Sequence, residues 1–135
     1  MNIAYQAHVK DLGWGPWVSN GGLAGTEGQG LRMEAVRIKV ENAPQGVGVQ
    51  YRVHVKDKGW LGWVANGEVA GTEGQGLRME ALEIRLTGNA PWSIVYQAHV
   101  QDIGWQTWAV DGATAGTTGQ GRRMEGLKII LARRP

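Results

Sequence analysis

The sequence predicts an all-β protein that folds as a pseudo-threefold β-prism of three four-stranded sheets, with a β-trefoil as the alternative. Three observations support this prediction. A unit of about 45 residues occurs three times in the 135-residue chain. Apolar and polar residues alternate with a period of two, which is typical of half-buried strands. The 22 glycines are enough to supply many tight turns.

The three copies are recognised by residue types that recur in one order. A tyrosine, a histidine and an aspartate come first, followed by a tryptophan pair, a glycine-rich segment and Arg-Met-Glu. The copies span residues 3–41, 49–87 and 94–132, and short Asn-Ala-Pro linkers join them. Because proline favours a turn, we interpret the linkers as joints within a single domain covering residues 1–135.

Each copy begins and ends with a strand pattern. In the first copy, apolar side chains alternate along residues 3–9 and again along residues 36–40. Between them, one or two short strands are expected near residues 17–19 and 23–24, because Asn20-Gly21 is a strong hairpin signal. This gives about four strands per copy, a count that fits a sheet of the prism or a leaf of the trefoil.

Composition narrows the classes of partner. The net charge is only +2 and the basic residues are scattered among acidic ones, which argues against nucleic acid as the partner. The chain lacks cysteine, so neither disulfides nor thiolate metal sites are expected, and we expect no cofactor. No apolar run is long enough to span a membrane, so we expect no membrane insertion, and any export signal would lie outside this chain. The composition is compatible with an oligomer as well as with a monomer.

A sugar site needs a flat apolar face, planar polar groups and backbone groups that are already held in place. Each copy supplies these from the stretch between its histidine and first tryptophan, together with a Gly-Gln-Gly segment and a glutamate. The predicted ligand-binding residues are His8, Asp11, Gly13, Trp14, Gln29 and Glu34, then His54, Asp57, Gly59, Trp60, Gln75 and Glu80, and finally His99, Asp102, Gly104, Trp105, Gln120 and Glu125.

Several of these residues also have a structural interpretation. In a chain without phenylalanine, at least one tryptophan of each pair is expected in the core, with Trp14 and its equivalents the ones that border a site. Strand parity places His8 on the face opposite Tyr5, away from the core, and argues against three histidines that bind zinc on the threefold axis. Trp92 is outside the repeat and is expected to fill an edge in the second joint.

Arg32 and Glu34 are two residues apart, so a regular strand would turn both toward the face of Val36. Either a β-bulge re-aims them or the carboxylate points inward and is paired, since an unpaired buried charge is too costly. A structural ion pair, or a carboxylate that accepts turn N–H groups, is the preferred interpretation, and sugar binding by Glu34 is the second.

The third copy illustrates the pattern: residues 96–105 read Tyr-Gln-Ala-His-Val-Gln-Asp-Ile-Gly-Trp, and Trp108, Asp111-Gly112, residues 115–121 and Arg123-Met-Glu follow. This pattern resembles the clostridial hydrophobic repeat with conserved tryptophan, the ChW repeat, over nearly the whole chain. The resemblance implies a bacterial extracellular or cell-surface protein that binds polysaccharide or mediates adhesion, without a catalytic mechanism. The third copy departs from the first two at Thr118, Arg122 and Gly126, so its site is expected to differ.

The sequence therefore predicts a secreted, multivalent, lectin-like protein with up to one carbohydrate site per copy. Three matching copies argue against an enzyme, because enzymes usually build one asymmetric cleft, whereas weak surface sites gain avidity when they are linked. The alternative is a protein-interaction or structural repeat module without sugar binding. Glycoside or peptidoglycan hydrolysis by His8, Asp11 or Glu34 is the third and least favoured hypothesis.

Overall fold

A computed structural model describes all residues, 1–135, and contains fifteen β-strands and no helix, hence no helix that could cross a membrane. Each repeat has five strands, of which the first and last are long and the middle three have two residues each. The strands are β1 (Asn2–Val9), β2 (Gly13–Trp14), β3 (Val18–Ser19), β4 (Ala24–Gly25), β5 (Met33–Glu41), β6 (Gly48–Val55), β7 (Gly59–Trp60), β8 (Val64–Ala65), β9 (Ala70–Gly71), β10 (Met79–Thr87), β11 (Trp92–Val100), β12 (Gly104–Trp105), β13 (Ala109–Val110), β14 (Ala115–Gly116) and β15 (Met124–Arg133).

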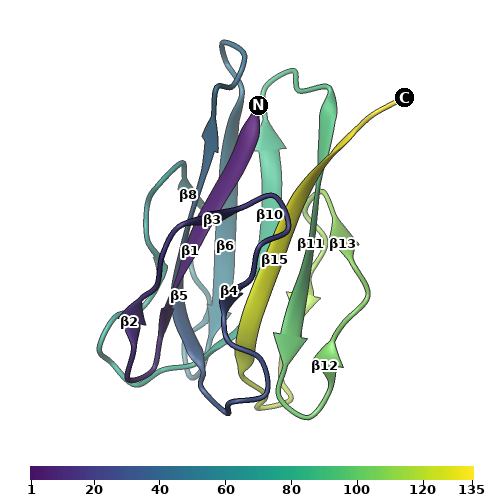
Figure 1. The fold of residues 1–135 in the computed structure, drawn as a ribbon. Helices are drawn as coiled ribbons and strands as arrows, with labels where there is room; N and C mark the ends of the chain where they lie inside the picture. The colour runs from purple at the N-terminus through teal and green to yellow at the C-terminus, as the bar shows by residue number, and fades with distance from the viewer.

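Three antiparallel sheets form the molecule, and each is centred on the two long strands of one repeat. These central pairs are β1 with β5, β6 with β10, and β11 with β15. Figure 1 shows the three pairs running side by side, with both chain termini at the same end. The inner faces of the sheets share one buried cluster of 25 residues. The predicted prism is therefore confirmed over the trefoil.

The sheets have five strands, not the four that were expected, because each repeat has three short strands between its long ones, and one of these three joins the sheet of a neighbour. Strand β9 of the second repeat joins β5, β14 of the third joins β10, and β4 of the first joins β15. The exchange is cyclic, so it ties the first repeat directly to the third. A two-residue strand has no periodicity to detect, and no local pattern specifies which neighbouring sheet it joins.

Glycine is required where an exchanged strand meets its host sheet. At Gly71, φ is +104° and an added Cβ would lie 2.4 Å from the carbonyl oxygen of Glu34. The next amide, Thr72 N–H, bonds that same oxygen at 3.0 Å, so the two backbones are held in close approach. Gly25 and Gly116 have equivalent positions, with 2.4 and 2.3 Å to the neighbouring carbonyl oxygen. No other residue fits this geometry without displacing a strand.

The core aromatic residues are tyrosines. Tyr5, Tyr51 and Tyr96 are completely buried, whereas no tryptophan is among the buried residues. The expectation that one tryptophan of each pair is buried in the core was therefore wrong. The physical reason is strand parity: β2 pairs with the end of β1 so that Trp14 lies opposite His8, whose side chain points away from the core face of Tyr5.

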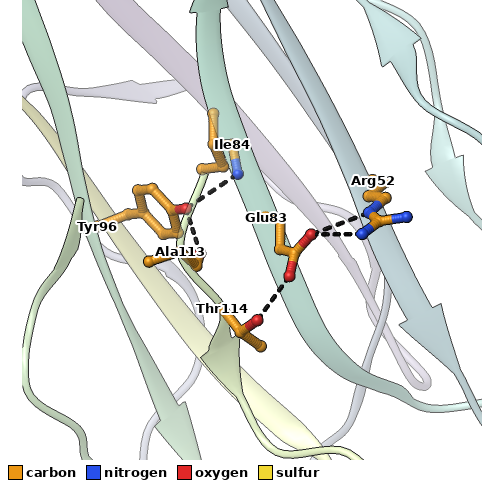
Figure 2. Close-up of polar contacts among 6 residues, drawn as sticks. All are labelled: Arg52, Glu83, Ile84, Tyr96, Ala113 and Thr114. Carbon is orange, nitrogen blue, oxygen red and sulfur yellow. Dashed lines mark hydrogen bonds and ion pairs between the residues drawn. The ribbon is translucent and has the colours of Figure 1, made fainter. Parts of the chain in front are cut away.

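Each buried tyrosine hydroxyl connects two repeats. Figure 2 shows Tyr96 donating to the carbonyl oxygen of Ala113 in its own repeat and accepting from Ile84 N–H of the preceding repeat at 3.1 Å. Tyr51 and Tyr5 bond equivalent backbone groups. Burial raises the pKa of Tyr51 and of Tyr96 to about 12, because the charged phenolate is poorly solvated in the core.

Candidate functional site

A β-bulge in each sheet places a buried glutamate beside the repeat's histidine. In the first sheet the register shifts between His8 and Val9, which leaves Glu34 without a partner on β1. The carboxylate is 4% exposed, accepts a hydrogen bond from Arg32 Nε at 2.9 Å, and has its second oxygen 3.2 Å from His8 Nδ1. Both alternatives proposed for Glu34 hold together: the bulge re-aims the side chain, and the charge is paired.

The same cluster recurs in the other two repeats. The Arg Nε to Glu distance is 2.9 Å in both, and the His Nδ1 to Glu distances are 3.1 and 3.0 Å, for Arg78, Glu80 and His54 and for Arg123, Glu125 and His99. One oxygen of each carboxylate accepts from an arginine Nε and the other lies close to a histidine Nδ1, although the Nδ1 atoms of His8 and His99 make no hydrogen bond, so these glutamates support the loops rather than offering a free acid. This geometry disfavours acid–base catalysis by Glu34.

The first tryptophan of a pair fastens one repeat to the next. The Trp14 ring meets the His8 ring edge to face, with 5.3 Å between centroids, and its Nε1 donates to Glu73 of the second repeat at 2.9 Å. Trp105 donates in the same way to Glu27 of the first repeat at 2.6 Å. The indole N–H groups of these two residues, which were predicted to border a ligand, are thus engaged in inter-repeat contacts.

An open hollow of about 320 Å³ lies at the junction of the first and second repeats. It is lined by His8, Val9, Lys10, Asp11, Gly13, Arg32 and Glu34 of the first repeat and by Gly74 and Gly76 of the second. Asp11 has a φ of +68°, and this turn conformation leaves its side chain exposed. Four of the six residues predicted for the first copy, His8, Asp11, Gly13 and Glu34, thus come together.

The prediction that each site takes its glutamine from the same repeat was wrong. The glycine loop facing His8 and Asp11 belongs to the second repeat, so Gln75, and not Gln29, is the nearest equivalent. Gln29 belongs instead to the loop that meets the third repeat, as the Trp105–Glu27 bond shows. Cyclic strand exchange explains the offset, because it moves each glycine loop next to the preceding repeat. Neither Trp14 nor Gln75 lines the hollow.

A family model described as clostridial hydrophobic W (ChW) matches the chain three times, at residues 8–42, 54–88 and 99–132. The matches cover most of the sequence and coincide with the three repeats. The chain belongs to the ChW family. No curated protein and no solved structure matches it. The bulge, the tryptophan and the glycine loop described above all lie within the matched segments.

The third ChW repeat changes the junction it forms with the second. By equivalence with Glu73 and Glu27, the partner of Trp60 would be residue 118, which is threonine, and Trp60 Nε1 makes no such bond. The Arg52 guanidinium lies over this indole, 4.7 Å from the ring centroid, as Arg37 and Lys128 lie over Trp14 and Trp105 at 6.0 and 4.5 Å. The departure noted in the sequence therefore removes one inter-repeat contact of three.

Replacing Thr118 with glutamate is expected to stabilise the protein by about 0.5–1.5 kcal/mol, the usual net value of one hydrogen bond. The new carboxylate would accept from Trp60 Nε1 and would lie near Arg52. Urea unfolding followed by tryptophan fluorescence measures the change. Glu73→Thr is the matched reverse variant and is expected to lose a similar amount. Equal stability of Thr118→Glu and the parent chain would show that the contact contributes nothing.

A second departure affects the third repeat's own aspartate. Arg122 replaces the leucine of the other copies, and its NH1 lies 3.6 Å from Asp102 Oδ2 and donates to the backbone oxygen of Gln101 at 3.1 Å. Asp11 and Asp57 have no such ion pair. The three junctions therefore share a backbone plan but not the same set of free polar groups.

The sequence did not predict that the second tryptophan of each pair lies on the surface. Trp17 and Trp108 are 36% and 40% exposed, although they were expected to be core residues. The Lys39 ammonium lies 4.3 Å from the Trp17 ring centroid, and Arg85 lies 4.0 Å from that of Trp63. The signal in the sequence was the cationic residues at outward positions of the long strands, which these exposed rings contact.

No group of three or more His, Cys, Asp or Glu side chains is placed to hold a metal ion.

Proposed function

We propose that this ChW protein is a multivalent carbohydrate-binding module with one site at each junction between repeats. The observation that supports the proposal is the open hollow beside Asp11, about 320 Å³ in volume and lined by charged residues, a histidine, three glycines and one valine. This volume is at the lower end of the range of roughly 300–1,000 Å³ found for small-molecule sites, which suits a single sugar ring.

The hollow offers the groups that a sugar ring needs. The exposed carboxylate of Asp11 accepts hydrogen bonds from two neighbouring hydroxyls, and the backbone at Gly74 and Gly76 has positive φ and no Cβ in the way. The contacts of buried Glu34 with Arg32 and His8 hold the wall rigid, so binding requires little reorganisation. The exposed apolar side chain nearest in sequence is Leu12, which follows Asp11 and is 63% exposed but lies outside the lining of the hollow.

The three sites would not be equal. At the third repeat, Asp102 is partly neutralised by Arg122, and at the second, residue 58 is lysine where the first has Leu12. We therefore expect the junction of the first and second repeats to bind a monosaccharide most tightly. Weak single sites then combine on a glycan-coated surface through linked contacts.

Asp11→Asn is expected to weaken monosaccharide binding at the first junction by about tenfold or more, because the substitution removes a charge-assisted acceptor. Asparagine tolerates positive φ, so the turn is retained. A glycan array identifies the sugar, and calorimetry with that sugar measures the affinity of the parent and the variant.

Glu41→Gln is the control, since it removes one exposed carboxylate at the far end of β5 and should leave the affinity unchanged. Absence of binding to any sugar on the array and in NMR titration would rule out the proposed function. An equal affinity of Asp11→Asn and the parent protein would move the site away from this hollow.

A second candidate function, protein–protein interaction, is favoured by the exposed apolar side chains. Trp17, Trp108 and Ile103 are all more than a third exposed, and exposed aromatic residues are common anchors in protein interfaces. This function predicts that Trp17→Ala abolishes capture of a protein partner while leaving glycan binding intact. The same variant pair, Trp17→Ala and Asp11→Asn, thus separates the two candidates.

A further inference from the structure

A second hollow, of about 290 Å³, lies where the three repeats meet on the pseudo-threefold axis. It has no apolar residue in its lining, which consists of Arg32, Lys56, Gly76, Arg78, Gln101, Gly121 and Arg123. The arginines immediately precede β5, β10 and β15, so the hollow is at the end of the prism opposite the chain termini (Figure 1). Three equivalent guanidinium groups therefore face one polar space.

Each of the three guanidinium groups is fixed at its Nε, whereas its terminal nitrogens keep unpaired N–H donors. Each uses its Nε to donate to the buried glutamate two residues later, and none of the terminal nitrogens has a hydrogen-bond partner in the protein. Each NH2 atom also lies against the glycine loop of the following repeat, as Arg32 does at Gly76. Three rigid forks of unused N–H donors thus border the same hollow.

The charge around this axial hollow is positive on the side that faces solvent. Three arginines and Lys56 contribute four positive charges and the three glutamates three negative ones, which leaves one net positive charge. The glutamate side chains are buried on the Nε side, at most 7% exposed, so they screen the terminal nitrogens only from the side away from the hollow. Three guanidinium groups converging on one space repel one another unless an anion lies between them.

We propose that the axial hollow binds a tetrahedral oxyanion, a phosphate or sulfate group that is either free or attached to a larger molecule. A tetrahedral oxyanion presents several oxygens that can each accept from a different arginine, and planar guanidinium forks suit such oxygens. The site is separate from the proposed sugar hollow, although Arg32 and Gly76 border both. It needs no sugar, so it stands or falls independently of carbohydrate binding.

The repeats themselves provide test variants that spare the Arg–Glu pairs. The position before the repeat's aspartate is Lys10, Lys56 and Gln101 in the three copies, and the second and third line the axial hollow. Gln101→Lys adds the cation that the third copy lacks, and Lys56→Gln removes the one that the second copy has. Neither change touches a buried charge, so both variants are expected to fold.

Calorimetric titrations with inorganic phosphate, each at one of several fixed ionic strengths, test the proposal. We expect one phosphate per chain, affinity that falls as salt rises, an approximately tenfold gain for Gln101→Lys and an approximately tenfold loss for Lys56→Gln. Arg78→Lys is expected to bind more weakly although it keeps the charge, because the fork is lost. Arg134→Gln, a distant single-charge control, should bind like the parent.

Parallel titrations with sulfate and with a hexose monophosphate distinguish a free oxyanion from a phosphorylated ligand. Tighter binding of the sugar phosphate than of phosphate would identify an attached phosphate as the ligand, and equal affinities would identify the free ion. No detectable binding of phosphate and sulfate by the parent chain would overturn the proposal. So would an unchanged affinity in both Gln101→Lys and Lys56→Gln.

Discussion

Gly71→Ala is expected to lower the free energy of unfolding by about 3 kcal/mol or more. Backbone strain at a positive φ costs on the order of 1–3 kcal/mol, and here a clash is added. The new Cβ would lie 2.4 Å from the carbonyl oxygen of Glu34, so β9 must move away from β5 and stretch the bond from Thr72 N–H to that oxygen. Because β9 is the strand that the second repeat lends to the first sheet, the substitution loosens the ring of exchanged strands.

Two other glycines separate the causes of this loss. Gly62 has no atom near its position and no positive φ, so Gly62→Ala should leave stability almost unchanged. Gly74 has a φ of +68° in open space, so Gly74→Ala should show the conformational cost alone, about 1 kcal/mol. Urea unfolding of the three variants measures each term. If Gly71→Ala lowered the free energy of unfolding no more than Gly74→Ala does, this result would contradict the close approach between β9 and β5.

Raising the pH from 10 to 12 is expected to remove about 4 kcal/mol of stability, which is a large part of the whole stability of many small proteins. The pKa of Tyr51 and that of Tyr96 are raised from 10.0 to about 12, mainly by burial. Above pH 10 the unfolded chain releases phenol protons that the native protein retains, so the unfolded state is favoured. Each of the two tyrosines contributes at most about 1.4 kcal/mol per pH unit, reached between the unfolded and folded pKa values, and about half of that at either pKa.

The stabilisation is complete below pH 10 and disappears as the pH approaches the folded pKa. Burial raises the pKa of Tyr5 as well, so the third tyrosine acts in the same direction. The chain has only these three tyrosines, and tyrosinate absorbance therefore reports on them alone. We expect this absorbance to appear together with unfolding, in one cooperative step above pH 10.

Tyr51→Phe provides the check on this alkaline transition. It removes one titrating phenol, so the dependence of stability on pH should become shallower, while at neutral pH the loss of its bonds to Ile38 N–H and Glu68 should cost about 1–3 kcal/mol. Tyrosinate absorbance that rises near pH 10 while circular dichroism stays native would contradict the burial of the hydroxyls.

The candidate site was predictable to the extent that it depends on local sequence. His8, Asp11 and Gly13 lie within one turn of the chain, and their closeness follows from that turn and from strand parity alone. The bulge at Glu34 was foreseen as one of two solutions to a parity conflict. The exposure of Trp17 was not foreseen, because this residue lies just before the two-residue strand β3 and no periodic pattern indicates which face it occupies.

The sequence by itself determined the threefold repeat, the all-β class and the inner faces of the long strands, because these depend on spacing and on a period of two. The tertiary structure alone decided which repeat completes each junction. Strand β9 pairs with β5 of the preceding repeat, which brings Gly74 and Gly76 to Asp11 and brings Arg32, Arg78 and Arg123 together on the axis. Near-identical repeats carry near-identical local signals, so only the closure of three sheets around a shared core selects the partner of each exchanged strand.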